Sequence, residues 1–267
     1  MNEGFRKPTA SNPIENGKLP HLKLSIDSKV PKLFFLPGDP DRLKLFEEAA
    51  DSFEYLSVNR EFSTGIGTFG GKEFGVCSTG IGGGSSEIVM VELHSLGVER
   101  VVRVGGCGAL RENIKCGDMI INSGAVRLGG SSKMYVRVEY PAVADPFMVV
   151  ELAKSASKKG IRAHVGIGAT VDSYYAGQGR CIEGFEIPGS SLPEELSSAG
   201  VINFDMETET IYTLASLMGM KAANILAVHG NRKTDEWLID YRSAQLCAIE
   251  TALETDFFNT LNEEGLI

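Results

Sequence analysis

Short apolar runs alternate with longer amphipathic stretches along most of this chain. The runs over 33–36 and 100–105 are rich in aromatic or β-branched residues and predict buried strands. After the first run, Leu43, Phe46 and Ala50 share one face of a predicted helix. The same patterns predict further strands near 62–69, 73–78, 118–128, 163–170 and 221–228, and helices from Ser85 or Ser86 to Gly97 and near 146–159, 206–218 and 240–260. The alternation predicts an α/β fold, a three-layer α/β/α sandwich around a mixed central sheet.

Length and composition narrow the class of protein. The 267 residues, 43% of them apolar, suffice for one sizeable core, so we expect a flexible N-terminal arm over 1–20 and a single domain over 21–267. A net charge of −9 argues against nucleic acid or an anionic membrane as partner. The five cysteines are odd in number and lack CxxC spacing, and no apolar run suggests a membrane span or a signal peptide. We therefore expect reduced thiols and a cytoplasmic location.

Two arginines stand where apolar strands end in glycine-containing loops. Arg103 interrupts a valine-rich strand, where a buried cation is costly unless an anion neutralises it. Arg42 follows the strand over 33–36 and the turn that contains Gly38, in the first turn of the next helix. In an acidic protein, such a pair predicts a local phosphate site.

Two glycine-rich segments are candidate nucleotide- or phosphate-binding motifs, and the evidence for the second is stronger. Gly65 to Gly70 spells GxGxxG, but a hairpin follows it instead of a helix, which argues against a dinucleotide-binding oxidoreductase. Gly80 to Ser85 joins a strand to a helix whose N-terminus can attract an anion. For this second loop, helix packing is an equally good explanation.

Three further segments combine polar groups suited to a nucleoside. Tyr174 to Arg180 offers rings, the Gln178 amide and a guanidinium, which match the edge of uracil, although a plain surface loop also fits the pattern. Asp205 and Glu207 either bind adjacent ribose hydroxyls or favour the start of a helix. His229 ends a strand, a ligand-facing position in α/β proteins.

Together these segments resemble the nucleoside phosphorylase-I family, and most closely its branch that acts on uridine. The resemblance implies that the central sheet is partly barrel-like. The matching segments follow one order: His21-Leu22-Lys23-Leu24, Pro37-Gly38-Asp39-Pro40-Asp41-Arg42, Asn59-Arg60-Glu61-Phe62, Ser78-Thr79-Gly80-Ile81-Gly82-Gly83, Arg103-Val104-Gly105, Pro141-Ala142-Val143-Ala144-Asp145, Gly177-Gln178-Gly179-Arg180, Met206-Glu207 and Asn231-Arg232.

The resemblance implies reversible phosphorolysis of uridine to uracil and ribose 1-phosphate, with deoxyuridine and thymidine as related substrates. Inorganic phosphate is then a co-substrate, and no organic cofactor is needed. Its implied phosphate ligands are Gly38, Arg42, Arg103 and, from the neighbouring subunit, Arg60. The implied nucleoside ligands are Met206, Glu207 and the neighbour's His21 at the ribose, and Tyr174, Gln178, Arg180, His229 and Arg232 at the base.

The resemblance also implies an assembly. Active sites would be shared within a dimer, and a ring of three dimers is the common arrangement in the family. Glu61, the Ile81 carbonyl and Ser85 resemble a site for a monovalent cation such as potassium at the dimer interface.

Four positions depart from the family pattern. Gly106 stands where a serine or threonine usually binds phosphate and ribose, so backbone N–H groups there would have to replace the hydroxyl. Asp205 replaces a glutamate, His229 an aliphatic residue and Tyr174 a phenylalanine. The last two make the base pocket more polar than the family norm.

The purine branch is the competing hypothesis within the family. It carries an aspartate after the last strand, and Val228 to Arg232 contains none, which favours a pyrimidine base. Two hypotheses of the same fold also stay open, a nucleoside hydrolase and a non-catalytic nucleoside-binding protein.

Overall fold

The computed structural model describes residues 8–187 and 191–257. Its centre is a mixed sheet in which five strands close into a ring. Around the ring, each strand pairs with the next and the last returns to the first: β10 (Lys221–Asn231), β6 (Met119–Arg127), β8 (Ala163–Thr170), β9 (Asn203–Asp205) and β5 (Arg100–Ala109). The predicted mixed and partly barrel-like sheet is confirmed.

The sheet continues outward from β5 as an open extension. β5 pairs in parallel with β1 (Leu33–Leu36), which pairs in parallel with β4 (Lys72–Cys77). The edge is antiparallel, formed by β3 (Phe62–Phe69) and β2 (Ser52–Asn59). Two-residue strands complete the sheet: β7 (Ala142–Val143) pairs with β6, and β11 (Glu236–Trp237) pairs with β10.

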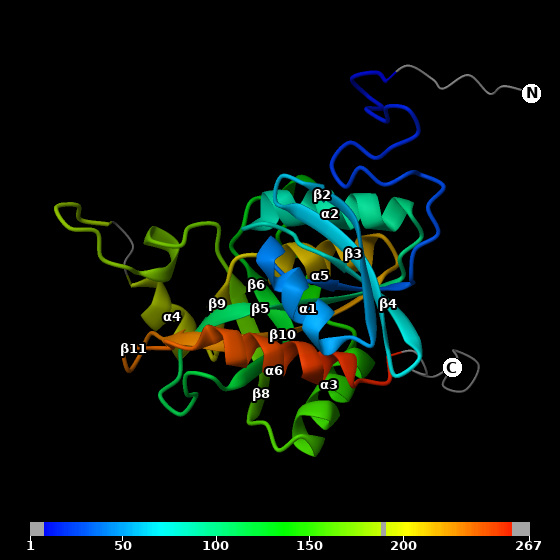
Figure 1. The fold of residues 1–267 in the computed structure, drawn as a ribbon. Coiled ribbons are helices and arrows are strands. Elements are labelled where there is room, and N and C mark those ends of the chain that lie inside the picture. Colours follow the sequence, from blue (N-terminus) through cyan, green and yellow to red (C-terminus); the bar gives the residue numbers. More distant parts are fainter. Residues whose placement is uncertain (1–7, 188–190, 258–267) are drawn as a thin grey trace, which may run out of the picture.

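Helices pack on both sides of this sheet (Figure 1). On one side α2 (Gly83–Ser95) packs beside α5 (Thr208–Leu217), and on the other α6 (Tyr241–Leu253) contacts both α1 (Leu43–Ala49) and α3 (Pro146–Lys158). A short helix, α4 (Leu192–Ser198), shares a small apolar core with β8 and β9. β1, β5 and β10 are buried along almost their whole length, as expected for strands between two helical layers. None of the described helices is both long and apolar enough to cross a bilayer.

The strands and helices differ from the predicted ones in several places. β2, β7, β9, β11 and α4 were not predicted, and three of these strands have only two or three residues, too few to show alternation. Neither Ser85 nor Ser86 caps α2; the cap residue is Gly82, with no side-chain hydrogen bond. The region 118–128 forms one strand, and the last helix ends at Leu253.

The predicted N-terminal arm lies partly outside the described residues, which begin at residue 8. Within residues 8–20, isolated bridges join Thr9 to Asn12 and Glu15 to Lys18. Leu19 is buried in the main core with Leu22 and Leu24. The core therefore reaches two residues into the predicted arm, whose flexibility stays a prediction.

Candidate active site

A cavity of about 750 Å³ is lined by residues along β5 and by residues at the ends of β9 and β10. β5 and β10 run parallel, and the carboxyl ends of neighbouring parallel strands commonly form the ligand-binding edge of an α/β sheet. Most of the predicted site residues line it: Gly38, Arg42, Arg103, Gly106, Tyr174, Gln178, Arg180, Met206, Glu207, His229 and Arg232, together with Glu61 and Ile81. Sequence segments that are far apart therefore meet around one space.

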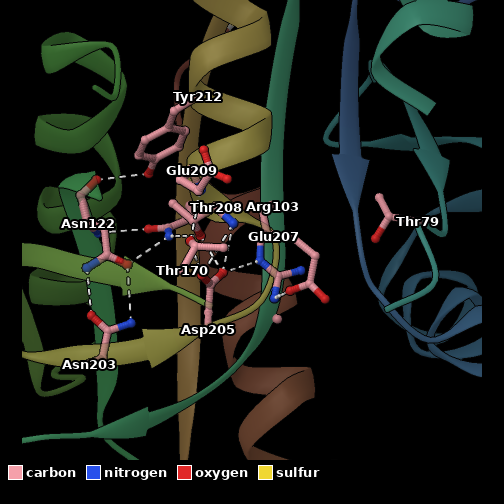
Figure 2. A network of polar contacts seen from close by, with 12 residues as sticks. Thr79, Arg103, Asn122, Thr170, Asn203, Asp205, Glu207, Thr208, Glu209 and Tyr212 are labelled. Carbon is pink, nitrogen blue, oxygen red and sulfur yellow. Dashed lines mark hydrogen bonds and ion pairs between the residues drawn. The ribbon is translucent and has the colours of Figure 1, made fainter. Parts of the chain in front are cut away.

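Arg103 is the buried centre of this cavity's polar wall. Its Nε donates to Asp205 Oδ2 at 2.9 Å, and its Nη2 forms an ion pair with Glu207 Oε2. Figure 2 shows the two carboxylates turned toward the guanidinium. Burial by itself lowers the pKa of Arg103, but Glu207 and Asp205 outweigh it and the pKa lies above the ordinary arginine value. Arg103 therefore stays charged.

One nitrogen of the Arg103 guanidinium has no partner in the described protein. This atom, Nη1, is also buried. Arg42 faces the same cavity, and its pKa is lowered by burial and then by the nearby Arg103 charge. A buried donor without an acceptor and two close cations are both costly in a dry site. An oxyanion between them would relieve both.

Asp205 is held by other groups instead of being free for a ribose. Its Oδ1 accepts from Thr170 Oγ1 at 2.6 Å, and its Oδ2 accepts from the backbone N–H and Oγ1 of Thr208 at 3.0 and 2.5 Å. Both oxygens are thus occupied by protein donors. The interpretation of Asp205 as a ribose ligand does not fit this geometry, and its effect is to fix the position of Arg103.

A chain of buried asparagines supports this arrangement from inside the ring. Asn224 Nδ2 donates to Thr208 Oγ1 and to Asn122 Oδ1, both at 2.9 Å. Asn122 Nδ2 in turn donates to Asn203 Oδ1 at 2.7 Å (Figure 2). Because buried polar groups with satisfied partners are rigid, the orientation of Arg103 is fixed by strands on several sides of the ring.

Glu207 connects the polar wall to the glycine loop before α2. Its Oε1 accepts from the backbone N–H of Gly82 at 2.7 Å. Burial raises the pKa of Glu207, while Arg103 opposes the shift. A Cβ on Gly83 would lie 2.6 Å from Thr210 Oγ1, so this glycine allows α2 to pack against α5. The loop from Gly80 to Ser85 thus contacts Glu207 and α5, and its Gly80 N–H also donates to the Gly38 carbonyl at 2.9 Å.

The loop over 174–180 forms the other end of the cavity. The Arg180 guanidinium carbon lies 3.6 Å above the Tyr174 ring centre, and Arg180 Nη1 donates to Gln178 Oε1 at 2.5 Å. Arg232 Nη2 donates to the Gly179 carbonyl at 3.0 Å. Burial and then Arg232 lower the pKa of Arg180, against the effect of Tyr174. The structure therefore brings together Tyr174, Gln178, Arg180 and Arg232, four of the side chains that were predicted to bind the base.

His229 and Gly106 occupy adjoining positions in the cavity wall. The imidazole covers Gly106 and lies 5.3 Å from the Tyr241 ring, measured between ring centres. Its Nε2 is 2.7 Å from Gln245 Nε2. Burial and then the Arg42 charge lower the pKa of His229 to about 4, so the ring is neutral at pH 7.

Three predicted residues do not line this cavity. Arg60 is exposed at the turn between β2 and β3, and Asn59 beside it donates to the His21 carbonyl at 2.7 Å. His21 itself contacts Glu92 Oε1 through Nδ1 at 2.7 Å. His21 and Arg60 thus lie near each other, and neither lines the cavity of its own chain.

Ser85, the third of them, lies beside Glu61 and Ile81. Its hydroxyl donates to the Ile81 carbonyl at 3.2 Å. A Cβ on Gly80 would contact both Glu61 Cγ at 2.7 Å and Ser85 Oγ at 3.0 Å. The three oxygen-bearing residues proposed for a cation are therefore neighbours around Gly80.

Several cavity residues were not predicted. Phe204 and Trp237 line the space, and Gln245 supports His229 from behind. The sequence could have indicated that Gln245 is buried. It precedes Ala248 and Ile249 by three and four positions, so it shares their buried helix face. Burial raises the pKa of the Cys107 thiol far above its usual range, which makes it a poor nucleophile.

Comparisons with known proteins agree with this geometry. A sequence profile of the phosphorylase superfamily matches residues 32–251, a range that contains every residue lining the cavity. The uridine phosphorylase of Thermococcus kodakarensis (strain ATCC BAA-918 / JCM 12380 / KOD1) is 43% identical over 210 residues, covering 78% of this chain and 76% of that protein. The guanosine phosphorylase of Halorubrum lacusprofundi (strain ATCC 49239 / DSM 5036 / JCM 8891 / ACAM 34) is 33% identical over 214 residues, covering 80% and 84%. The crystal structure of uridine phosphorylase from Vibrio fischeri ES114 has a TM-score of 0.80 at 29% identity, covering 90% of this chain and 97% of that one.

Proposed function

Because this chain belongs to the phosphorylase superfamily, we propose that it catalyses the reversible phosphorolysis of uridine to uracil and ribose 1-phosphate. One observation carries this proposal: the buried, unpartnered Nη1 of Arg103, the Arg42 side chain and the loop over 174–180 meet in one cavity. We assign that loop to the base. Anion site and base site lie in the same space, as transfer of a sugar between phosphate and a base requires.

At the anion end, phosphate binds between Arg42 and Arg103, with the Gly38 and Gly106 backbone beside it. Glu207 accepts a hydrogen bond from the ribose 2′-hydroxyl, and Met206 packs against the sugar. Asp205 holds the Arg103 guanidinium in place, and Arg103 Nη1 donates to the bound phosphate. Holding both reactants in this way replaces a bimolecular encounter by a positioned reaction.

During the reaction, a phosphate oxygen forms a bond to the anomeric carbon as the bond from that carbon to uracil N1 breaks. The electron pair of the broken bond leaves with uracil as an anion, and the proton of the phosphate group ends on that base through solvent, which gives uracil and ribose 1-phosphate. Arg180 and Gln178, with Arg232 behind them, stabilise the negative charge on the leaving base. Gln178 Oε1 has a second lone pair for the uracil N3–H while it accepts from Arg180. The phosphate dianion stabilises the positive charge that develops on the sugar.

The site is completed by a second copy of the chain. His21 and Arg60 lie near each other and neither lines the cavity of its own chain, which fits two residues donated to one neighbouring site. The partner subunit's Arg60 would reach phosphate, and its His21 the 5′-hydroxyl. A dimer with shared sites, assembled as three dimers in a cytoplasmic protein, is part of this proposal.

Glu61, the Ile81 carbonyl and Ser85 fit a monovalent cation. The three residues are neighbours around Gly80, Glu61 and Ile81 line the cavity, and a carboxylate, a carbonyl and a hydroxyl are suitable ligands for potassium. The bound cation would order the loop before α2, whose Gly82 N–H holds Glu207.

A nucleoside panel tests the function. Uridine, deoxyuridine, thymidine, inosine and guanosine are incubated with and without phosphate, and free base and pentose 1-phosphate are measured. Release of uracil that depends on phosphate and yields ribose 1-phosphate supports the proposal. Equal release without phosphate identifies a hydrolase, and binding without turnover identifies a nucleoside-binding protein.

Guanosine is the second candidate substrate. The Halorubrum relative is named a guanosine phosphorylase, and Asp235 adds a carboxyl group to the cavity wall. A carboxylic acid can protonate a purine leaving group. A higher kcat/KM for guanosine than for uridine would assign the chain to that reaction.

A further inference from the structure

The His229 imidazole occupies the space that a side chain at position 106 would need. A Cβ built on Gly106 would lie 2.3 Å from His229 Cε1 and 2.4 Å from Nδ1. Real atoms do not approach so closely, so residue 106 must be glycine while the ring is there. At this point the His229 imidazole forms the cavity wall, in the place of a side chain at position 106 of β5.

Gln245 determines which nitrogen of this ring carries the proton. Gln245 Nε2 donates to the Gly105 carbonyl at 3.0 Å, and a carbonyl oxygen only accepts, so the amide orientation is fixed. The same Nε2 lies 2.7 Å from His229 Nε2, and its second hydrogen points there. His229 Nε2 therefore accepts, and in the neutral ring the proton is on Nδ1.

The orientation of the ring is also restricted. Tyr241 packs against one side at 5.3 Å between ring centres, and the Gly106 backbone adjoins it. Among the described residues, Nδ1 has no hydrogen-bond partner, and His229 lines the cavity. The lowered pKa keeps the ring neutral at pH 7, and Arg42 is close enough to contribute to the shift. A neutral N–H donor thus lies beside Gly106, on the strand that carries Arg103, in the wall of the cavity that Arg42 also lines.

We propose that His229 binds the co-substrate, with Nδ1–H donating a hydrogen bond to an oxygen of the phosphate held by Arg42 and Arg103. Gln245 is a positioning residue that sets the required tautomer. This inference rests on the proposed function and extends it. Gly106 and His229 are complementary, because the absence of a side chain at position 106 makes room for the imidazole, which supplies the hydrogen-bond donor.

Binding of inorganic phosphate, measured by calorimetry without nucleoside, tests this contact. His229→Leu removes the donor and keeps an apolar side chain, whereas His229→Asn restores an N–H close to the position of Nδ1. A hydrogen bond to an anion corresponds to roughly a 10- to 100-fold change in Kd. We expect such a weakening in His229→Leu and recovery to within about fivefold of wild type in His229→Asn. Unchanged affinity in His229→Leu, or equal weakening in both variants, overturns the proposal.

Gln245→Leu gives an independent readout if His229→Leu is poorly folded, which thermal melting will reveal. Loss of the fixed tautomer should weaken phosphate binding several-fold, and His229→Leu combined with Gln245→Leu should bind no more weakly than His229→Leu alone. Additive losses would overturn the coupling. Uridine turnover is measured on the same samples. Histidine-dependent phosphate binding without turnover refutes the proposed function alone, whereas phosphorolysis with intact phosphate affinity in His229→Leu refutes this inference alone.

Discussion

The two ends of the cavity are built in different ways. At the anion end, Arg103 is buried between Asp205 and Glu207 and is supported by a hydrogen-bond network that crosses the ring of strands. At the base end, Arg180 and Tyr174 lie on one loop, partly open to solvent, and contact mainly each other. The anion end thus depends on the folding of the whole ring, whereas the base end depends on a local loop. Mutations at the anion end should therefore lower both stability and activity, whereas mutations at the base end should lower activity with little change in stability.

The largest effect is expected from Arg103→Ala. This change leaves Asp205 and Glu207 buried without their cation, a situation that typically costs about 3–5 kcal/mol. It also removes a donor to phosphate, and we expect kcat/KM for uridine to fall by roughly 10³-fold. Urea unfolding and steady-state kinetics measure the two losses. The matched control is Arg162→Ala, an exposed arginine outside the cavity, and equal stability of the two variants would contradict the buried-network interpretation.

Arg180→Ala should affect catalysis almost alone. In the proposed mechanism the lost guanidinium stabilises the leaving base, and removal of one such contact commonly costs about 10²–10³ in kcat. The side chain is half-buried on a loop, so the melting temperature should stay close to that of wild type and phosphate affinity should not change. Near-normal uridine cleavage by Arg180→Ala would refute the base assignment.

The contrast between the two ends also explains what the sequence could predict. Arg103 was recognisable because a charged residue within a valine run is chemically unusual, and the family resemblance inferred from the motifs is confirmed by the superfamily match. β9 was missed because its three residues show no periodicity, although this strand closes the ring and carries Asp205. Asp205 itself was interpreted as a ribose ligand or a helix-start acid, since the partners that occupy it, Thr170 and Thr208, are decided by tertiary packing. The fit between Gly106 and His229 depends on the register of β5 and β10, which one sequence does not reveal.

A smaller effect is expected when pH is lowered through the range in which His229 titrates. Its pKa is about 4 in the folded protein and near 6.5 when unfolded, so between these values the unfolded chain binds more protons. Stability is therefore lost as pH falls from about 6.5 toward 4. At about 1.4 kcal/mol per pH unit, this one group should cost roughly 2–3 kcal/mol between pH 7 and pH 4.5.

Urea unfolding of wild type and His229→Leu at the two pH values measures this contribution. The variant should lose roughly 2–3 kcal/mol less than wild type over the same interval. Parallel losses in the two proteins would mean that His229 is not held neutral by the fold. Other titrating groups act on both proteins alike, so the comparison isolates this ring.

The smallest effect should be optical and concerns the base end. Trp237, the chain's single tryptophan, lines the cavity and is 55% exposed. Uridine bound beside it should exclude water from the indole and shift its emission to shorter wavelength, whereas phosphate alone should leave the emission nearly unchanged. Trp237→Phe should lose the signal and retain most of the turnover. An equal shift with phosphate alone would mean that anion binding reorganises the base end, and the two ends would then be coupled instead of independent.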